Sequence, residues 1–136
     1  MEKKIKRGIT ASTFDLLHAG HILMLKEAKS VCDYLIVALQ VDPTIDRPEK
    51  NKPIQSYYER WVQVSAVKYV DEIIPYATEE ELRTILQNYD IDIRILGDEY
   101  ARKPFTGSDL KMEYHFNKRT HGYSSTELRK RIKSLE

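Results

Sequence analysis

The sequence predicts a single α/β domain over residues 1–136, in which helices cover both faces of a five-stranded parallel β-sheet. The main observation is that apolar, β-branched runs alternate with segments of helical periodicity, as in parallel sheets with crossover helices. The second is a length of 136 residues, enough for one hydrophobic core, without a linker or internal repeat. The expected strands are 5–10, 34–41, 72–74, 92–96 and 111–116, and the expected helices are 22–31, 57–67, 79–88 and 124–134.

The third observation is that three of these helices begin at a Ser/Thr-x-x-Glu capping box, whose side chains bond backbone amides that the helix leaves free. The pairs are Ser56 with Glu59, Thr78 with Glu81, and Ser124 with Glu127. By contrast, segments 42–55 and 97–109 lack periodicity, and each follows an expected strand. Open α/β sheets bind ligands at the carboxyl edge of their strands, so both segments are expected beside a ligand site.

The charge balance argues against a partner held by a general electrostatic field. The chain has 22 Lys and Arg residues against 21 Asp and Glu, a net charge of +1. Nucleic-acid binding is therefore not expected, and any anionic ligand must be held by a local site. Cys32 is the only cysteine, and no segment resembles a signal peptide or a membrane span. We expect a cytoplasmic protein without a membrane partner.

The most informative segment is 13–21, with the sequence TFDLLHAGH, which places His18, Gly20 and His21 at the start of an expected helix. The free amides and the dipole of a helix N-terminus attract anions, and a glycine lets a phosphate approach the backbone. At this spacing both histidines suit either an anion or a metal ion. The metal is the weaker alternative, because the His-Glu-x-x-His pattern and further nearby ligands are missing. In a third interpretation, one histidine caps the helix and the other packs.

A second anion site is predicted in segment 119–126, with the sequence RTHGYSST. Ser124, Ser125 and Thr126 open the last expected helix, so their hydroxyls and free amides can cradle phosphate oxygens. Ordinary capping by Ser124 is the alternative. Arg119 favours the phosphate interpretation, because a guanidinium just before a helix can bind phosphate bidentately.

Together, the two segments resemble the HxGH and RTxGxSTT motifs of the nucleotidyltransferase superfamily, and in particular its small cytidylyltransferases. The motifs lie about 100 residues apart in the family's order, and the likeness covers nearly the whole chain, most strongly towards members that act on glycerol 3-phosphate. The resemblance implies a Rossmann-like sheet of order 3-2-1-4-5. It also implies transfer of CMP from CTP to a small phosphorylated alcohol, such as glycerol 3-phosphate or a similar polyol or amino-alcohol phosphate, with direct in-line attack and release of pyrophosphate.

The resemblance further implies a role for individual residues of this sequence. The catalytic residues would be His18, His21, Lys50 and Arg119. The nucleotide-binding residues would be Thr13, Phe14, Gly20, Gly97, Asp98, Thr120, Ser124, Ser125 and Thr126. The acceptor-binding residues would be Asp15, Asp42, Lys52 and Arg60. The nucleoside triphosphate implies Mg²⁺, for which no carboxylate cage is assigned, and relatives suggest a homodimer.

For several of these residues an ordinary structural role stays open. Asp15 suits a turn or a helix cap, Lys50 lies in a charged loop typical of a solvated surface, and Arg60 suits an ion pair. Asp98 equally suits a turn carboxylate. In relatives, a mobile loop at 46–53 carries a lysine to the α-phosphate; spacing favours Lys50 over Lys52 for this role.

Three departures from the family pattern leave the acceptor open. Segment 97–109 is longer than expected and borders the acceptor side, and no tryptophan occurs near 77–79, since the sole tryptophan, Trp61, lies in an expected helix with a packing role. His121 and Tyr123 replace the Glu and Ile of the second motif, which could alter base contacts. The alternatives are an adenylyltransferase that uses ATP, for example on a sugar phosphate, and a non-catalytic nucleotide-binding module.

Overall fold

In the computed structural model, which describes residues 4–136, five parallel strands form one sheet in the order β3-β2-β1-β4-β5. This confirms the predicted order. The strands are β1 (Arg7–Ser12), β2 (Tyr34–Gln40), β3 (Glu72–Tyr76), β4 (Ile93–Gly97) and β5 (Glu113–Asn117). The helices are α1 (Ala19–Ser30), α2 (Tyr57–Ser65), α3 (Glu79–Asn88) and α4 (Ser125–Lys133), with 3₁₀ turns at Pro43–Ile45 and Asp98–Arg102.

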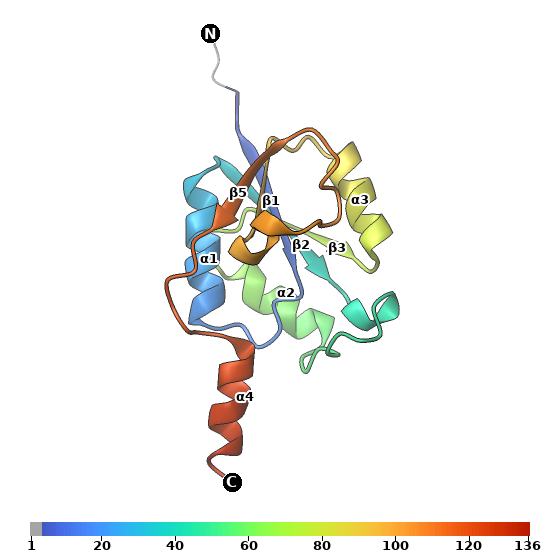
Figure 1. Cartoon of the computed structure of the whole chain (residues 1–136). Coiled ribbons are helices and arrows are strands. Elements are labelled where there is room, and N and C mark those ends of the chain that lie inside the picture. The colour runs from blue at the N-terminus through green and yellow to red at the C-terminus, as the bar shows by residue number, and fades with distance from the viewer. Residues whose placement is uncertain (1–3) are drawn as a thin grey trace.

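Helices cover both faces of this sheet, as Figure 1 shows. Side chains alternate along a strand, so Leu35, Val37 and Leu39 of β2 face one side and Ile36 and Ala38 face the other. The first set shares a core with α1 and α2, and the second with α3. Strand β2 is buried from both sides, which explains its continuous apolar sequence.

The helix starts agree with the predicted capping boxes in part. Only Ser56 and Glu59 bond each other's backbone amides, whereas Glu81 accepts from Ala77 N and Ser124 makes a single bond to the Glu127 amide. Helix α1 begins three residues before the periodic segment. The side chain of His18 provides its N-cap, in agreement with the capping interpretation of the motif.

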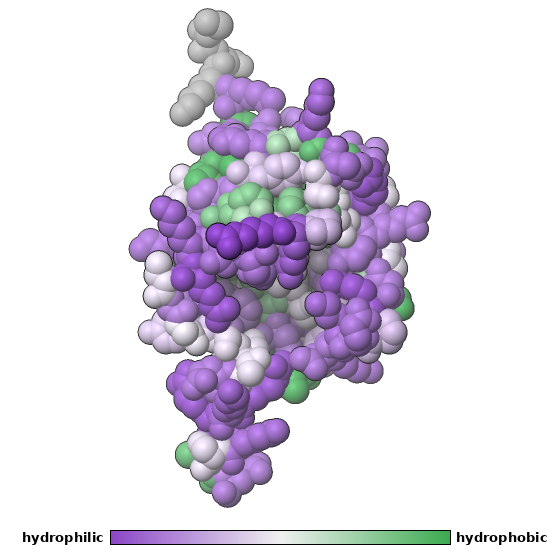
Figure 2. All heavy atoms as spheres, in the orientation of Figure 1, coloured by the Kyte–Doolittle hydropathy of each residue, from purple (hydrophilic) through white to green (hydrophobic). Residues whose placement is uncertain are grey.

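The sheet order makes β1 and β4 neighbours at the centre, and their carboxyl ends open towards the same edge. Such a switch point leaves a crevice at that edge. Helix α4 begins there, where Ser125 Oγ donates to the carbonyl of Asp15 (3.2 Å), and extends away from the sheet without a buried residue (Figure 1). Figure 2 shows a hollow near the middle of this view, surrounded by hydrophilic surface. Within residues 4–136, no helix combines the length and apolarity that a membrane crossing requires.

Candidate active site

The turn from β1 into α1 holds two histidines in a fixed arrangement. His18 is the N-cap of α1, and its Nδ1 accepts from the Gly20 amide at 3.0 Å. The backbone amide of His18 donates to Nδ1 of His21 at 3.2 Å, and the two rings stack with centroids 3.9 Å apart. Since both Nδ1 atoms accept, each neutral ring carries its proton on Nε2. The capping interpretation of His18 therefore holds, and it leaves Nε2–H free as a donor.

Burial keeps these rings neutral. It lowers the pKa of His21 to about 4, and the neighbouring His18 lowers this pKa further, against an opposing effect of Asp15. Burial also lowers the pKa of His18, with smaller contributions from His121 and Arg119. At neutral pH the pair thus offers two uncharged N–H donors rather than two cations.

Gly20 is required by the close approach of these rings. A Cβ at this position would lie 2.8 Å from Cε1 of His18 and 3.0 Å from Cε1 of His121. Any side chain here would push the imidazoles out of place. His121 comes from the second motif, so Gly20 lies where the two motifs meet.

Two adjacent clefts open at this edge of the sheet. The smaller, which we call the motif cleft, has a volume of about 490 Å³ and brings the two motifs together with the end of β4. Of the predicted residues it is lined by His18, Gly20, His21, Gly97, Asp98, Arg119, Thr120, Ser124 and Ser125. Residues from segments about 100 positions apart thus surround one space, as the topological switch predicts.

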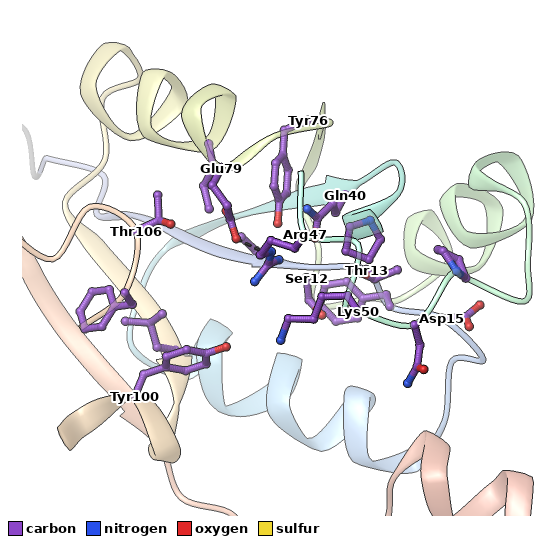
Figure 3. A pocket seen from close by; sticks show the side chains of 18 of the residues that line it. Ser12, Thr13, Asp15, Gln40, Arg47, Lys50, Tyr76, Glu79, Tyr100 and Thr106 are labelled. Carbon is purple, nitrogen blue, oxygen red and sulfur yellow. Dashed lines mark ion pairs between the residues drawn. The ribbon is translucent and has the colours of Figure 1, made fainter. Parts of the chain in front are cut away.

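The larger, which we call the loop cleft, has a volume of about 700 Å³. It is lined by Thr13, Phe14, Asp15 and Lys50 of the predicted residues, and it shares His21 and Ser125 with the motif cleft. In Figure 3 the side chain of Lys50 points into this cavity, and Lys50 N donates to the Arg47 carbonyl at 2.9 Å. His21 therefore stands in the wall between the two clefts.

The turn that carries this wall has an unusual backbone. Phe14 and Leu16 have φ angles of 51° and 52°, which non-glycine residues adopt rarely. The Phe14 side chain is buried in the core, with its ring centroid 5.3 Å from that of His21. Phe14 thus anchors the turn through packing, and the residue also lines the loop cleft.

The acceptor-binding residues predicted from the resemblance occupy mainly structural positions. The Asp15 carboxylate accepts from the amides of Ile54 and Gln55 at 2.8 and 2.9 Å, so it fixes the chain just before α2. Asp42 caps the 3₁₀ turn by accepting from Thr44, and this bonding lowers the pKa of the Asp42 carboxyl. Asp42, Lys52 and the predicted nucleotide ligand Thr126 line neither cleft.

Arg60 differs most from its predicted role. Its side chain is 1% exposed and its guanidinium donates to four backbone carbonyls at 2.5 to 3.2 Å. These carbonyls belong to Thr13, Gln40, Val41 and Gln55. Arg60 lines neither cleft, because its donors hold together the turns after β1 and β2. The geometry supports a positioning role rather than contact with an acceptor phosphate.

One wall of the loop cleft consists of residues that were not predicted as site residues. It is built by Arg47, Tyr76, Glu79, Arg94 and Tyr100, and the first three gather at one side in Figure 3. A signal for Arg94 was present, since an arginine interrupts the apolar run of a buried strand. Such a residue is buried only where it has a polar partner or a function.

Among residues 4–136, no three His, Cys, Asp or Glu side chains are grouped closely enough to hold a metal ion. In this part of the chain, the histidine pair thus lacks the further side-chain ligand that the metal alternative requires. Any Mg²⁺ would depend on ligand phosphate oxygens for most of its coordination.

The fold and this site define a class: an open α/β protein with a crevice at its switch point, lined by neutral and cationic donors of the kind that suit phosphate. Residues 9–131 match the model of the cytidylyltransferase-like family. The chain belongs to this family and is a nucleotidyltransferase.

Comparison with individual relatives supports this family assignment. Glycerol-3-phosphate cytidylyltransferase of Bacillus subtilis is 35% identical over 131 residues, covering 96% of this chain and 100% of that protein. FAD synthase of Thermococcus sibiricus is 31% identical, covering 85% of each. A crystal structure of the lipopolysaccharide core biosynthesis protein of Thermoplasma volcanium is similar with a TM-score of 0.61 and 26% identity, covering 97% of this chain and 89% of that one.

Proposed function

We propose that the protein transfers CMP from CTP to a small phosphorylated alcohol and releases pyrophosphate. The observation that carries this is the position of His21 between the two clefts. The motif cleft would hold the triphosphate, and the loop cleft the acceptor. The reacting α-phosphate would then lie at their junction, beside His21 and Ser125.

The chemistry needs positioning and charge stabilisation rather than an enzymic nucleophile. An acceptor phosphate oxygen attacks the α-phosphorus in line, and the bond from this phosphorus to the bridging oxygen of the β-phosphate breaks. The Nε2–H groups of His18 and His21 would donate to the phosphate oxygens, with Arg119 neutralising the departing pyrophosphate. Lys50 would reach the α-phosphate from the loop cleft. Neutral donors suit this role because their hydrogen bonds strengthen as charge builds up on those oxygens.

We propose that Mg²⁺ enters bound to the triphosphate, where it would neutralise part of the phosphate charge. Asp98, which lines the motif cleft together with Glu27 and Glu99, would be a carboxylate for its hydration shell. The homodimer implied by the family resemblance is also a proposal.

Adenylyl transfer from ATP is the second candidate. It is favoured by the likeness to an FAD synthase and by His121 and Tyr123, which line the motif cleft in place of the usual Glu and Ile. Their rings stack with centroids 5.1 Å apart, and His121 Nδ1 accepts from the Tyr123 amide. This pair could change the contacts available to the base. A non-catalytic nucleotide-binding module is the remaining alternative.

A pyrophosphate-release screen decides among the three. CTP and ATP are each paired with glycerol phosphate, ethanolamine phosphate, choline phosphate and sugar phosphates. We expect turnover with CTP, and a loss of roughly 100-fold or more in kcat for His21→Gln, as for removal of one charge-stabilising donor. His115→Gln is the matched control, since His115 pairs with Glu27 and lines neither cleft. A clear ATP preference would select the second candidate, and turnover with neither nucleotide would select the module.

A further inference from the structure

Arg94 is a buried cation at the wall of the loop cleft. It lies on β4, is 4% exposed, and its Nη1 donates to the Thr106 carbonyl. Its guanidinium carbon also lies over the Phe105 ring, 5.2 Å from the centroid. Within the described part of the chain, no carboxylate approaches the guanidinium within ion-pair distance. Burial lowers the pKa of Arg94, although an arginine stays charged at neutral pH.

One nearby carboxylate, Glu79, acts on this charge, but it is shared with a second cation. Arg47 pairs with Glu79 at 2.9 Å, so the wall contains two cations and one anion. The other polar side chains here, such as Tyr76 and Tyr100, are neutral. A buried charge is costly unless it is paired, so this surplus of one positive charge points to an anionic ligand group.

The surplus comes from other elements than those that carry the groups proposed for the reacting phosphate. Arg94 lies on β4 and contacts Thr106 and Phe105, whereas Thr13 follows β1 and Lys50 lies in the loop after β2. The cleft of about 700 Å³ is in the range that holds drug-sized ligands, and a three-carbon phosphate would fill only part of it.

The segment that departs from the family pattern builds this end of the cleft. Tyr100, Phe105 and Thr106 line it, and Tyr114 Oη donates to the Gly107 carbonyl at 3.0 Å, which ties the segment to β5. Gly107 has φ +84°, and a Cβ there would meet Leu86 Cδ1 at 2.7 Å. The extra residues therefore form a fixed structure around Arg94 rather than a loose insertion.

We propose that the acceptor carries a second anionic group, a carboxylate or a second phosphate, which Arg94 binds at the end remote from the reacting phosphate. The proposal rests on the proposed function, in which the loop cleft holds the acceptor. It makes Arg94 a specificity-determining residue. It also predicts that acceptors with a cationic end, such as ethanolamine phosphate, bind weakly because their ammonium group would face the surplus positive charge.

Calorimetric titration of the free enzyme with three-carbon ligands of matched length tests this proposal. The ligands are glycerol 3-phosphate, 3-phosphoglycerate and 1,3-propanediol bisphosphate, of which the last two add a carboxylate or a phosphate. We expect at least one of these two to bind roughly tenfold or more tightly than glycerol 3-phosphate, about the value of a hydrogen bond to a charged group. Which of the two gains more identifies the anionic group.

Variants separate a local contact from overall charge attraction. Arg94→Gln should abolish the preference, and Arg94→Lys should restore part of it. Arg83→Gln is the matched control on the surface of α3, where Arg83 pairs with Asp109, and it should keep the preference. The proposal is overturned if the wild type binds all three ligands equally, a result that holds even where Arg94→Gln fails to fold. It is also overturned if the preference persists in a folded Arg94→Gln protein. Both outcomes are independent of pyrophosphate release with CTP, which tests the proposed function separately.

Discussion

The imidazole rings of His18 and His21 stack at 3.9 Å, and each presents Nδ1 to a backbone amide of the same turn. The helix N-terminus therefore uses one nitrogen of each ring for its own capping and leaves the other for a ligand. Protonation of either Nδ1 would break a capping hydrogen bond, so the fold itself opposes a positive charge on the pair.

This arrangement predicts that the histidines titrate at low pH. In an NMR titration of the ring protons, the midpoint of His21 should lie near 4 and that of His18 below the ordinary value of 6.5. The unfolded chain would then bind more protons between about pH 6.5 and 4, so the free energy of unfolding should fall as the pH drops through that window. His18→Gln and His21→Gln assign the signals. Midpoints at or above 6.5 for both would contradict the assignment of the ring protons to Nε2.

Gly20→Ala should separate activity from stability. The added Cβ would press on His18 and His121, and a displacement of about 1 Å at a reacting centre can cost roughly 100-fold in rate. Alanine is the better helix former by about 1 kcal/mol, which offsets the strain in the folded state. We therefore expect a large loss of kcat with a nearly unchanged melting temperature. Turnover at the wild-type rate would show that the rings have room to move.

Much of the fold could be predicted from the sequence because its signals are local. The continuous apolar sequence of β2 and the Ser56–Glu59 box each identify an element, and the sheet order follows from the family resemblance. Periodicity alone placed the start of α1 three residues late, whereas the motif of His18, Gly20 and His21 indicated the helix start that the structure shows.

For the candidate site, too, one part could be predicted from the sequence and another could not. The motif cleft could be predicted because the switch point of the sheet brings the two motifs together, and their residues line one space there. The wall around Arg94 depends on how segments 42–55 and 97–109 pack, and no periodicity encodes that packing. Nor could the sequence show that the side chains of Arg60 and Asp15 form hydrogen bonds with backbone groups of distant turns.

The two lysines of the loop between β2 and α2 should differ in effect. Lys50 lines the loop cleft and Lys52 does not. Lys50→Gln should lower kcat roughly 100-fold with a smaller change in the KM for CTP, because its charge would act on the α-phosphate in the transition state. Lys52→Gln should lower kcat much less. Steady-state kinetics with saturating acceptor measures both, and a larger loss for Lys52→Gln would reverse the assignment.

Arg60→Met should destabilise the protein rather than weaken acceptor binding. The substitution removes the donor to four carbonyls around the turns after β1 and β2, of which that of Gln40 is fully buried with Arg60. Since each unsatisfied buried group costs about 1–3 kcal/mol, the free energy of unfolding should fall by about 3 kcal/mol or more in urea titrations. The free energy of unfolding of Arg60→Lys should lie between those of the wild type and Arg60→Met, because one ammonium cannot reach all four carbonyls.

Arg83→Met provides the comparison, since Arg83 makes an exposed ion pair and its loss should leave the urea midpoint nearly unchanged. Steady-state kinetics of the folded Arg60→Lys protein completes the test. A positioning role predicts that Arg60→Lys, measured below its unfolding transition, lowers kcat and raises the acceptor KM together, because the turn that carries Thr13 and His21 loosens. A direct contact with the acceptor phosphate would instead leave the urea midpoint at the wild-type value and raise the acceptor KM alone, and that result would return Arg60 to the acceptor site.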